Sequence, residues 1–238
     1  MATTANIVDV IASEAGIPAS VVAMKARYLT HASVLPKGGR GTGAPQLTSR
    51  DAAQLILALA HDGPAVETAE AVRALGAYPV MQSSKIWSHS GRHSPYEVAI
   101  TSDGGTLLDA LAGMIDAARV EDTVSADFTY AMMMFGTFSI TQSGGVTWAQ
   151  IEPSMYVAEK YNINMEHSPV VSSNESIFLF SENDEKFSAI VRTPRTLRRR
   201  TSISFSMFFV VADALGKTTA IPAWPTFRRL APSTEESK

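Results

Sequence analysis

A short break between two helical stretches constrains the start of this chain more than any other feature. Apolar residues spaced by three and four predict a helix over residues 6–15, and a second helix is predicted over residues 19–31. Gly16 suits the left-handed residue that ends a helix, and Pro18 suits the first turn of the next one. We therefore predict two helices joined by a tight turn.

The second predicted helix has two faces of different composition. At 100° per residue, the apolar face consists of Val21, Val22, Ala26, Tyr28 and Leu29. The opposite face consists of Ser20, Ala23, Arg27, Thr30 and His31. Lys25 interrupts the apolar face, so either its stem extends along apolar surface to solvent or the helix packs in another orientation. The polar face suits contact with the major groove of DNA.

A basic, glycine-rich segment follows the second helix. It begins after Leu35-Pro36 and reads Lys-Gly-Gly-Arg-Gly-Thr-Gly over residues 37–43. A third helix is predicted after it, capped by Thr48 or Ser49 and continuing to residue 60. Two helices, a tight turn and a basic loop together predict a nucleic-acid-binding module.

These residues resemble winged helix-turn-helix regulators of the MerR type. Arg27-Tyr28, Leu35-Pro36 and the basic segment 37–43 carry the resemblance, which covers about the first quarter of the chain. It implies that Arg27 and Tyr28 contact backbone phosphates, and that Lys37 and Arg40 reach a phosphate or the minor groove. It also implies a dimer whose C-terminal half dimerises or senses a ligand.

Two sets of candidate binding residues follow. The predicted DNA-contacting residues are Ser20, Arg27, Tyr28, Thr30, His31, Lys37, Arg40 and Arg50. The candidate phosphate-binding residues in a second basic run are Arg195, Arg198, Arg199 and Arg200. The alternative for the second run is a solvated loop, or arginines paired with the acidic residues between 182 and 185.

Composition excludes several classes of protein. The chain has 238 residues, a net charge of −3 and no cysteine, so disulfides and thiolate metal sites are excluded and a reducing compartment is expected. No signal-peptide pattern is present, and no apolar stretch reaches the roughly 18 residues that span a bilayer. We expect a cytoplasmic protein with no membrane contact.

The rest of the chain is predicted to contain two more helices and mostly strands. A fourth helix is predicted over residues 65–75, and another over residues 106–119. Strands are predicted over residues 96–101, 128–141, 146–151, 176–180, 187–192 and 201–211. The predicted fold class is α+β: a helical winged helix-turn-helix module followed by a mostly antiparallel β domain with one or two helices. The predicted division is a DNA-binding domain 1–76, a linker 77–94, a dimerisation or ligand-binding domain 95–228 and a flexible tail 229–238.

No set of residues predicts catalysis. His89 and His93 have a spacing that binds metal on a helix, but the serines and glycine around them oppose a helix and no third ligand is near. No serine has a nucleophile-elbow context. The aromatic, Met-rich stretch 128–138 predicts core, with a dimer interface or an apolar ligand pocket as the alternative. We therefore expect neither an enzyme nor a bound metal or cofactor.

The leading hypothesis is a sequence-specific transcriptional regulator of bacterial or phage type that binds double-stranded DNA as a homodimer. A small-molecule effector is left open. The first alternative is a phage-type nucleic-acid packaging or assembly protein that uses the same N-terminal fold. The second is a ligand-binding module or an enzyme in the C-terminal domain.

Overall fold

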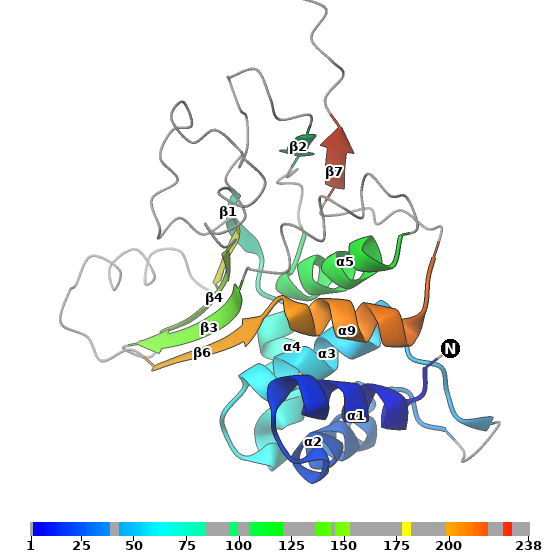
Figure 1. Ribbon diagram of the computed structural model, residues 1–238. Coiled ribbons are helices and arrows are strands. Elements are labelled where there is room, and N and C mark those ends of the chain that lie inside the picture. Colours follow the sequence, from blue (N-terminus) through cyan, green and yellow to red (C-terminus); the bar gives the residue numbers. More distant parts are fainter. Residues whose placement is uncertain are drawn as a thin grey trace, which may run out of the picture.

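Helices and antiparallel sheets make up the computed structural model, which is an α+β protein (Figure 1). The structure describes residues 2–38, 43–83, 96–99, 105–120, 137–143, 146–152, 178–181, 199–218 and 226–229. The α+β class with antiparallel strands is therefore confirmed. The predicted strand 187–192, the Met-rich residues 128–136, His89 and His93 lie outside the described residues.

The predicted helices form close to their expected bounds. They are α1 (Thr4–Ala15), α2 (Ala19–His31), α3 (Ser49–Ala60), the 3-10 turn η2 (Ala65–Glu67) with α4 (Thr68–Gly76), and α5 (Leu107–Arg119). The hydroxyls of Thr48 and Thr106 each accept a hydrogen bond from the backbone N–H of the third helical residue, an aspartate. The carboxylate of that aspartate accepts one from the threonine N–H, so α3 and α5 both begin with a capping box. Local sequence therefore determines where these two helices start.

Five strands form the larger sheet, in the order β1-β5-β4-β3-β6. Their bounds are β1 (Val80–Ser83), β3 (Thr137–Ser143), β4 (Val146–Glu152), β5 (Phe178–Ser181) and β6 (Arg199–Ser204). β3 and β4 pair from Ser143 opposite Val146, as the predicted hairpin requires. A separate two-stranded sheet pairs β2 (Tyr96–Ala99) with β7 (Thr226–Arg229).

One sequence prediction is wrong in this part of the chain. The strand predicted over residues 201–211 ends at Ser204, and α9 (Ser206–Leu215) follows it. Buried Phe208, Val211 and Leu215 have helical spacing, which the alternation of the preceding residues obscured. Within residues 77–94, predicted as a linker, β1 pairs with β5 at the edge of the larger sheet.

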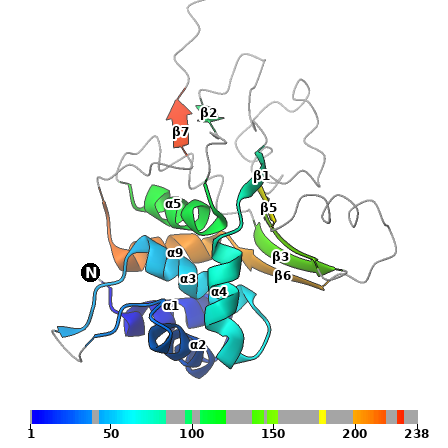
Figure 2. The same ribbon diagram turned by 180° about the vertical axis from the view of Figure 1, so that it is seen from behind.

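The hydrophobic core continues across the boundary predicted at residue 76. α9 packs against both α1 and α5, and α5 packs against α3 (Figure 2). Buried side chains from Ala2 to Leu215 belong to one cluster. The N-terminal helices therefore share their core with elements from the far end of the chain.

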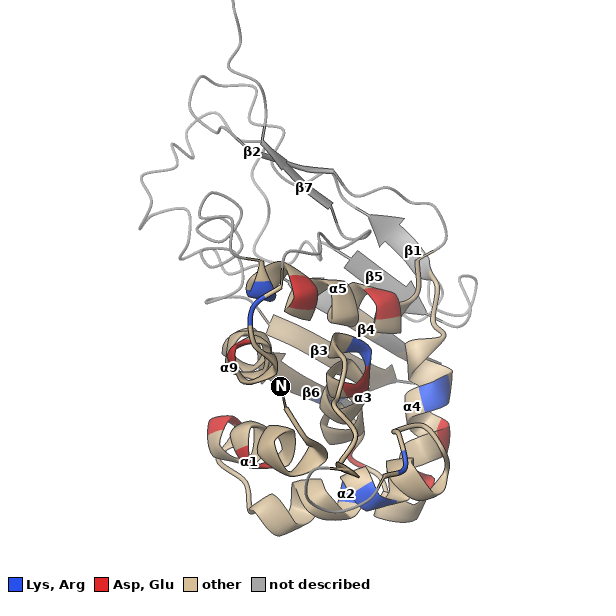
Figure 3. Ribbon diagram, turned by 90° about the vertical axis from the view of Figure 1, so that its right-hand side faces the viewer, with Lys and Arg blue, Asp and Glu red and all other residues tan. Residues whose placement is uncertain are grey.

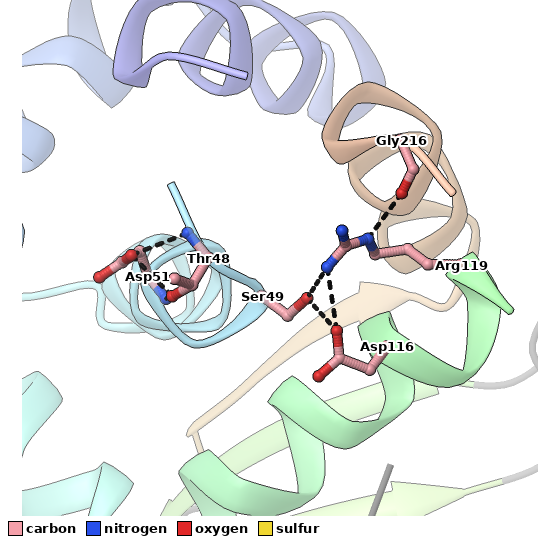
Figure 4. Close-up of polar contacts among 6 residues, drawn as sticks. All are labelled: Thr48, Ser49, Asp51, Asp116, Arg119 and Gly216. Carbon is pink, nitrogen blue, oxygen red and sulfur yellow. Dashed lines mark hydrogen bonds and ion pairs between the residues drawn. The ribbon is translucent and has the colours of Figure 1, made fainter. Parts of the chain in front are cut away.

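A polar network joins three of these helices (Figure 4). Ser49 at the start of α3 donates to the Asp116 carboxylate of α5. Arg119 donates to the Ser49 hydroxyl at 2.9 Å, to Asp116 at 3.1 Å and, through Nε, to the Gly216 carbonyl after α9 at 2.7 Å. Because Ser49 is buried, this network fixes the relative positions of α3, α5 and α9.

Phe208→Ala tests the shared core. Phe208 is fully buried and meets the Phe205 ring edge-on, with centroids 5.6 Å apart. We expect the variant to lose about 3–5 kcal/mol of unfolding free energy, the usual result of emptying a buried aromatic site. Urea unfolding followed by circular dichroism measures this loss. Val66→Ala, at a side chain 66% exposed, is the control and should change little. Loss of the sheet while α1 and α2 stay folded would contradict a shared core.

Candidate nucleic-acid interface

The turn between α1 and α2 has the geometry expected of its glycine. Gly16 has φ 64°, and its N–H donates to the carbonyls of Ala12 and Ser13. Ile17 N also donates to Ala12 O, at 3.1 Å. A side chain at position 16 would be strained in this left-handed conformation. The turn therefore sets the angle at which α2 leaves α1.

α2 is oriented somewhat differently from the sequence-based prediction. Its buried residues are Val22, Lys25, Ala26 and Leu29. Tyr28 was assigned to the apolar face, but it is 38% exposed because the buried face is centred nearer to Leu29. Thr30 is half-buried, and its hydroxyl donates to Ala26 O at 2.9 Å. The exposed surface of α2 therefore carries Ser20, Arg27 and His31 as predicted, and Tyr28 in addition.

Hydrogen bonds to α3 and to the residue after it explain why Lys25 lies on the buried face of α2. Its Nζ donates to Ala58 O at 2.7 Å and to His61 O at 2.5 Å, at the C-terminal end of α3. Burial lowers the pKa of Lys25, and the nearby charge of Asp62 opposes that shift. A helix C-terminus carries partial negative charge, so this ammonium satisfies carbonyls that the helix leaves open. Lys25 thereby fixes α2 against α3, and its stem does not extend to solvent. The alternative orientation of α2 is met in part, because Tyr28 is exposed while Lys25 stays on the buried face.

A groove of about 980 Å³ runs along the exposed side of α2. One wall consists of Thr3 and residues of the first half of α1, and the other of Pro36, Gly38, Ala44 and Pro45. Ser20, Arg27, Thr30 and His31 line it from α2. The groove therefore brings four of the predicted DNA-contacting residues together.

The segment between α2 and α3 is held beside the N-terminus. Leu47 N donates to Ala2 O at 3.0 Å, and Thr3 bridges to Gln46. The chain that leaves α2 and the chain that returns to α3 lie so close together that a Cβ at Gly38 would be 2.1 Å from Pro45 Cδ. Lys37 is exposed in the chain that leaves α2, and Arg40 lies outside the described residues. This close approach requires glycine at position 38, whereas a Cβ at Gly43 would meet nothing within 4 Å.

The remaining predicted residues lie elsewhere. Arg50 is in the first turn of α3 and pairs with Asp109 of α5 at 2.5 Å. Burial raises the pKa of Asp109, but hydrogen bonds from Thr106 and Arg50 and the Arg50 charge lower it more, so it falls below its usual range. Arg199 and Arg200 lie on β6 opposite Gln142 and Thr141 of β3, and neither lines the groove. The other two members of this run, Arg195 and Arg198, lie outside the described residues.

Basic and acidic residues around α2 lie on different elements. Figure 3 shows basic positions on α2 and on the segment beside it, with acidic positions on α1 and α4. Within the groove, Arg27 and His31 face one carboxylate, that of Asp9. Met24, which the sequence-based set omitted, is 45% exposed on the same helix. The sequence-based set consisted of residues with polar or charged groups, so an apolar methionine was not selected.

Comparison of the chain with family models, with curated proteins and with solved structures finds no match. Among the described residues, no three histidine or acidic side chains come together as a metal site. None of the helices in the described part of the chain combines the length and hydropathy needed to cross a bilayer.

Lys25→Met tests whether the lysine holds α2. The substitution keeps the aliphatic stem but leaves the Ala58 and His61 carbonyls without their donor. We expect a loss of about 1–3 kcal/mol in unfolding free energy, as for buried carbonyls that lose a charged donor. Urea unfolding measures it, with Lys37→Met at an exposed lysine as the control. A stability equal to that of the parent protein would show that the buried ammonium contributes nothing net.

Acid should destabilise the protein through His61. Burial and the Lys25 charge lower the pKa of His61, Asp62 and Glu67 oppose the shift, and the buried Nε2 has no hydrogen-bond partner among the described residues. The unfolded chain takes up this proton near pH 6.5 and the folded protein only at lower pH, so unfolding free energy falls as pH drops through about 6.5 and levels off below the folded pKa. Urea unfolding between pH 7.5 and 5 should show a smaller fall in His61→Gln than in the parent protein. His31→Gln, which leaves His61 in place, should retain the parent's dependence. An unchanged slope in His61→Gln would contradict this assignment.

Proposed function

We propose that the protein is a sequence-specific DNA-binding regulator that contacts a DNA duplex through α2 and the basic segment beside it. One observation carries the proposal: the exposed surface of a turn-linked second helix presents Ser20, Arg27 and His31 next to a groove and an exposed Lys37. Hydroxyl, guanidinium and imidazole groups are hydrogen-bonding groups that contact base edges and phosphates.

The dimensions of α2 support contact with a duplex. Its 13 residues extend about 20 Å, enough to follow part of a major groove that is about 12 Å wide. The groove along α2 offers room for the sugar-phosphate strand that borders the major groove. Thr3, Thr4 and Ala5, at the N-terminal end of α1, line it, and backbone N–H groups at a helix start favour anions. In this arrangement α2 reads bases and contacts the adjacent phosphates through Arg27, while α1 and the basic segment hold the backbone further away.

The proposal also covers the type of DNA-binding fold, the oligomeric state and the cellular location. The α1, α2 and basic-loop arrangement supports a winged helix-turn-helix interpretation, with residues 37–43 as the wing. A homodimer on a two-fold-related DNA site would double the basic contacts that each chain offers. The chain would then be a cytoplasmic regulator of bacterial or phage type, without catalytic activity, and the C-terminal elements would carry dimerisation or an effector site.

Arg27→Ala tests the proposed face. Duplexes recovered from a random pool by the full-length protein serve as the probe, and fluorescence anisotropy at several salt concentrations measures affinity. Loss of one phosphate contact should weaken binding about tenfold and reduce the salt slope by about one. The matched control is Lys217→Ala, which removes one exposed positive charge after α9, away from the groove.

Two results would count against the proposal. Recovery of no duplex at low salt would reject DNA binding altogether. Equal weakening in Arg27→Ala and Lys217→Ala would indicate general charge attraction and reject α2 as the contacting face.

A further inference from the structure

The large apolar side chains most exposed in the described part of the chain lie on two elements that contact each other. They are Met24 and Tyr28 on α2 and Val66 on η2, which packs against α2. Met24 is 45% exposed and lies one helical turn from both Ser20 and Tyr28. An apolar side chain thus occupies the middle of the surface that carries the proposed DNA contacts.

The surroundings of Met24 limit what can cover it. Arg27 is three residues away on the same helix, His31 lies one turn further, and exposed Lys37 follows. These groups favour a polyanion over an apolar protein surface. A second copy of this chain placed face to face on Met24 would bring the Arg27 guanidinium groups of both copies together, which like charge disfavours. The occupant therefore combines negative charge with a small apolar group.

We infer that Met24 is a specificity-determining residue that contacts the C5-methyl group of a thymine in the major groove. The inference rests on the proposed function. Among the base edges in the major groove, the thymine methyl is the apolar feature, and apolar side chains recognise it. The flexible thioether side chain adapts to such a contact without a fixed partner geometry. Arg27 and His31 on the same surface then hold the adjacent backbone, which places Met24 against base edges.

Replacing thymine with uracil tests this contact, because it removes the methyl group and leaves the hydrogen-bonding edge intact. The probe is a duplex recovered from the random pool, with each thymine replaced in turn, bound to the full-length protein. We expect one position at which the parent protein loses about fourfold in affinity, the equivalent of one buried methyl group at about 0.8 kcal/mol. In Met24→Ala the loss at that position should disappear, while losses at other positions remain.

Val66→Ala is the matched control, because it truncates an exposed apolar side chain on the neighbouring η2 and should keep the full methyl dependence. Uracil substitution without effect at any position, recovered sites without thymine, or an undiminished loss in Met24→Ala would each overturn the inference while leaving DNA binding intact. Dissociation of a dimer by Met24→Ala in sedimentation would overturn it in favour of a protein interface. Failure to recover any duplex would reject the proposed function and the inference together.

Discussion

The buried ammonium of Lys25 is the interaction on which the arrangement of α2 depends. It joins the inner side of α2 to the last carbonyls of α3, at 2.7 Å and 2.5 Å. Arg73 of α4 adds a second attachment by donating to the Ala32 carbonyl, just after α2 ends. With these two contacts made, rotation of α2 about its axis would break charged hydrogen bonds, of which the Lys25 bond to Ala58 is buried and the Arg73 bond is exposed. The exposed surface of α2 is therefore determined by polar contacts on its inner side as much as by apolar packing.

This fixation connects α2 to the far end of the chain. α3 receives Lys25 at its C-terminal end, and its first residue, Ser49, belongs to the network that includes Arg119 and the Gly216 carbonyl. α9 in turn packs on α1, which forms one wall of the groove. A rearrangement of α9 would therefore move a wall of the proposed interface as well as the core. In a regulator, such continuity would let a signal received by C-terminal elements change DNA affinity without a hinge between domains.

The sequence predicted those features whose causes are local. Gly16, Thr48 and Thr106 act on backbone groups within a few residues, so the turn and the two helix starts followed from pattern alone. What pattern could not supply depends on partners distant in sequence. Lys25 is separated from Ala58 by 33 residues, and the sequence pattern did not predict the exposure of Tyr28. α9 was mistaken for a strand because its first residues alternate, and only its packing against α1 and α5 selects the helical period.

The same distinction applies to the candidate site. Ser20, Arg27 and His31 are exposed along one helix, so periodicity was sufficient to group them, whereas the groove exists because Leu47 pairs with Ala2 and Gly38 lies against Pro45. Arg50 had the right charge, yet Asp109 engages it on another helix. Composition alone also passes over Met24, since an apolar residue in a helix is ordinarily core. Its exposure follows only from the buried face that Val22, Lys25, Ala26 and Leu29 form together, which leaves Met24 on the outer surface of α2.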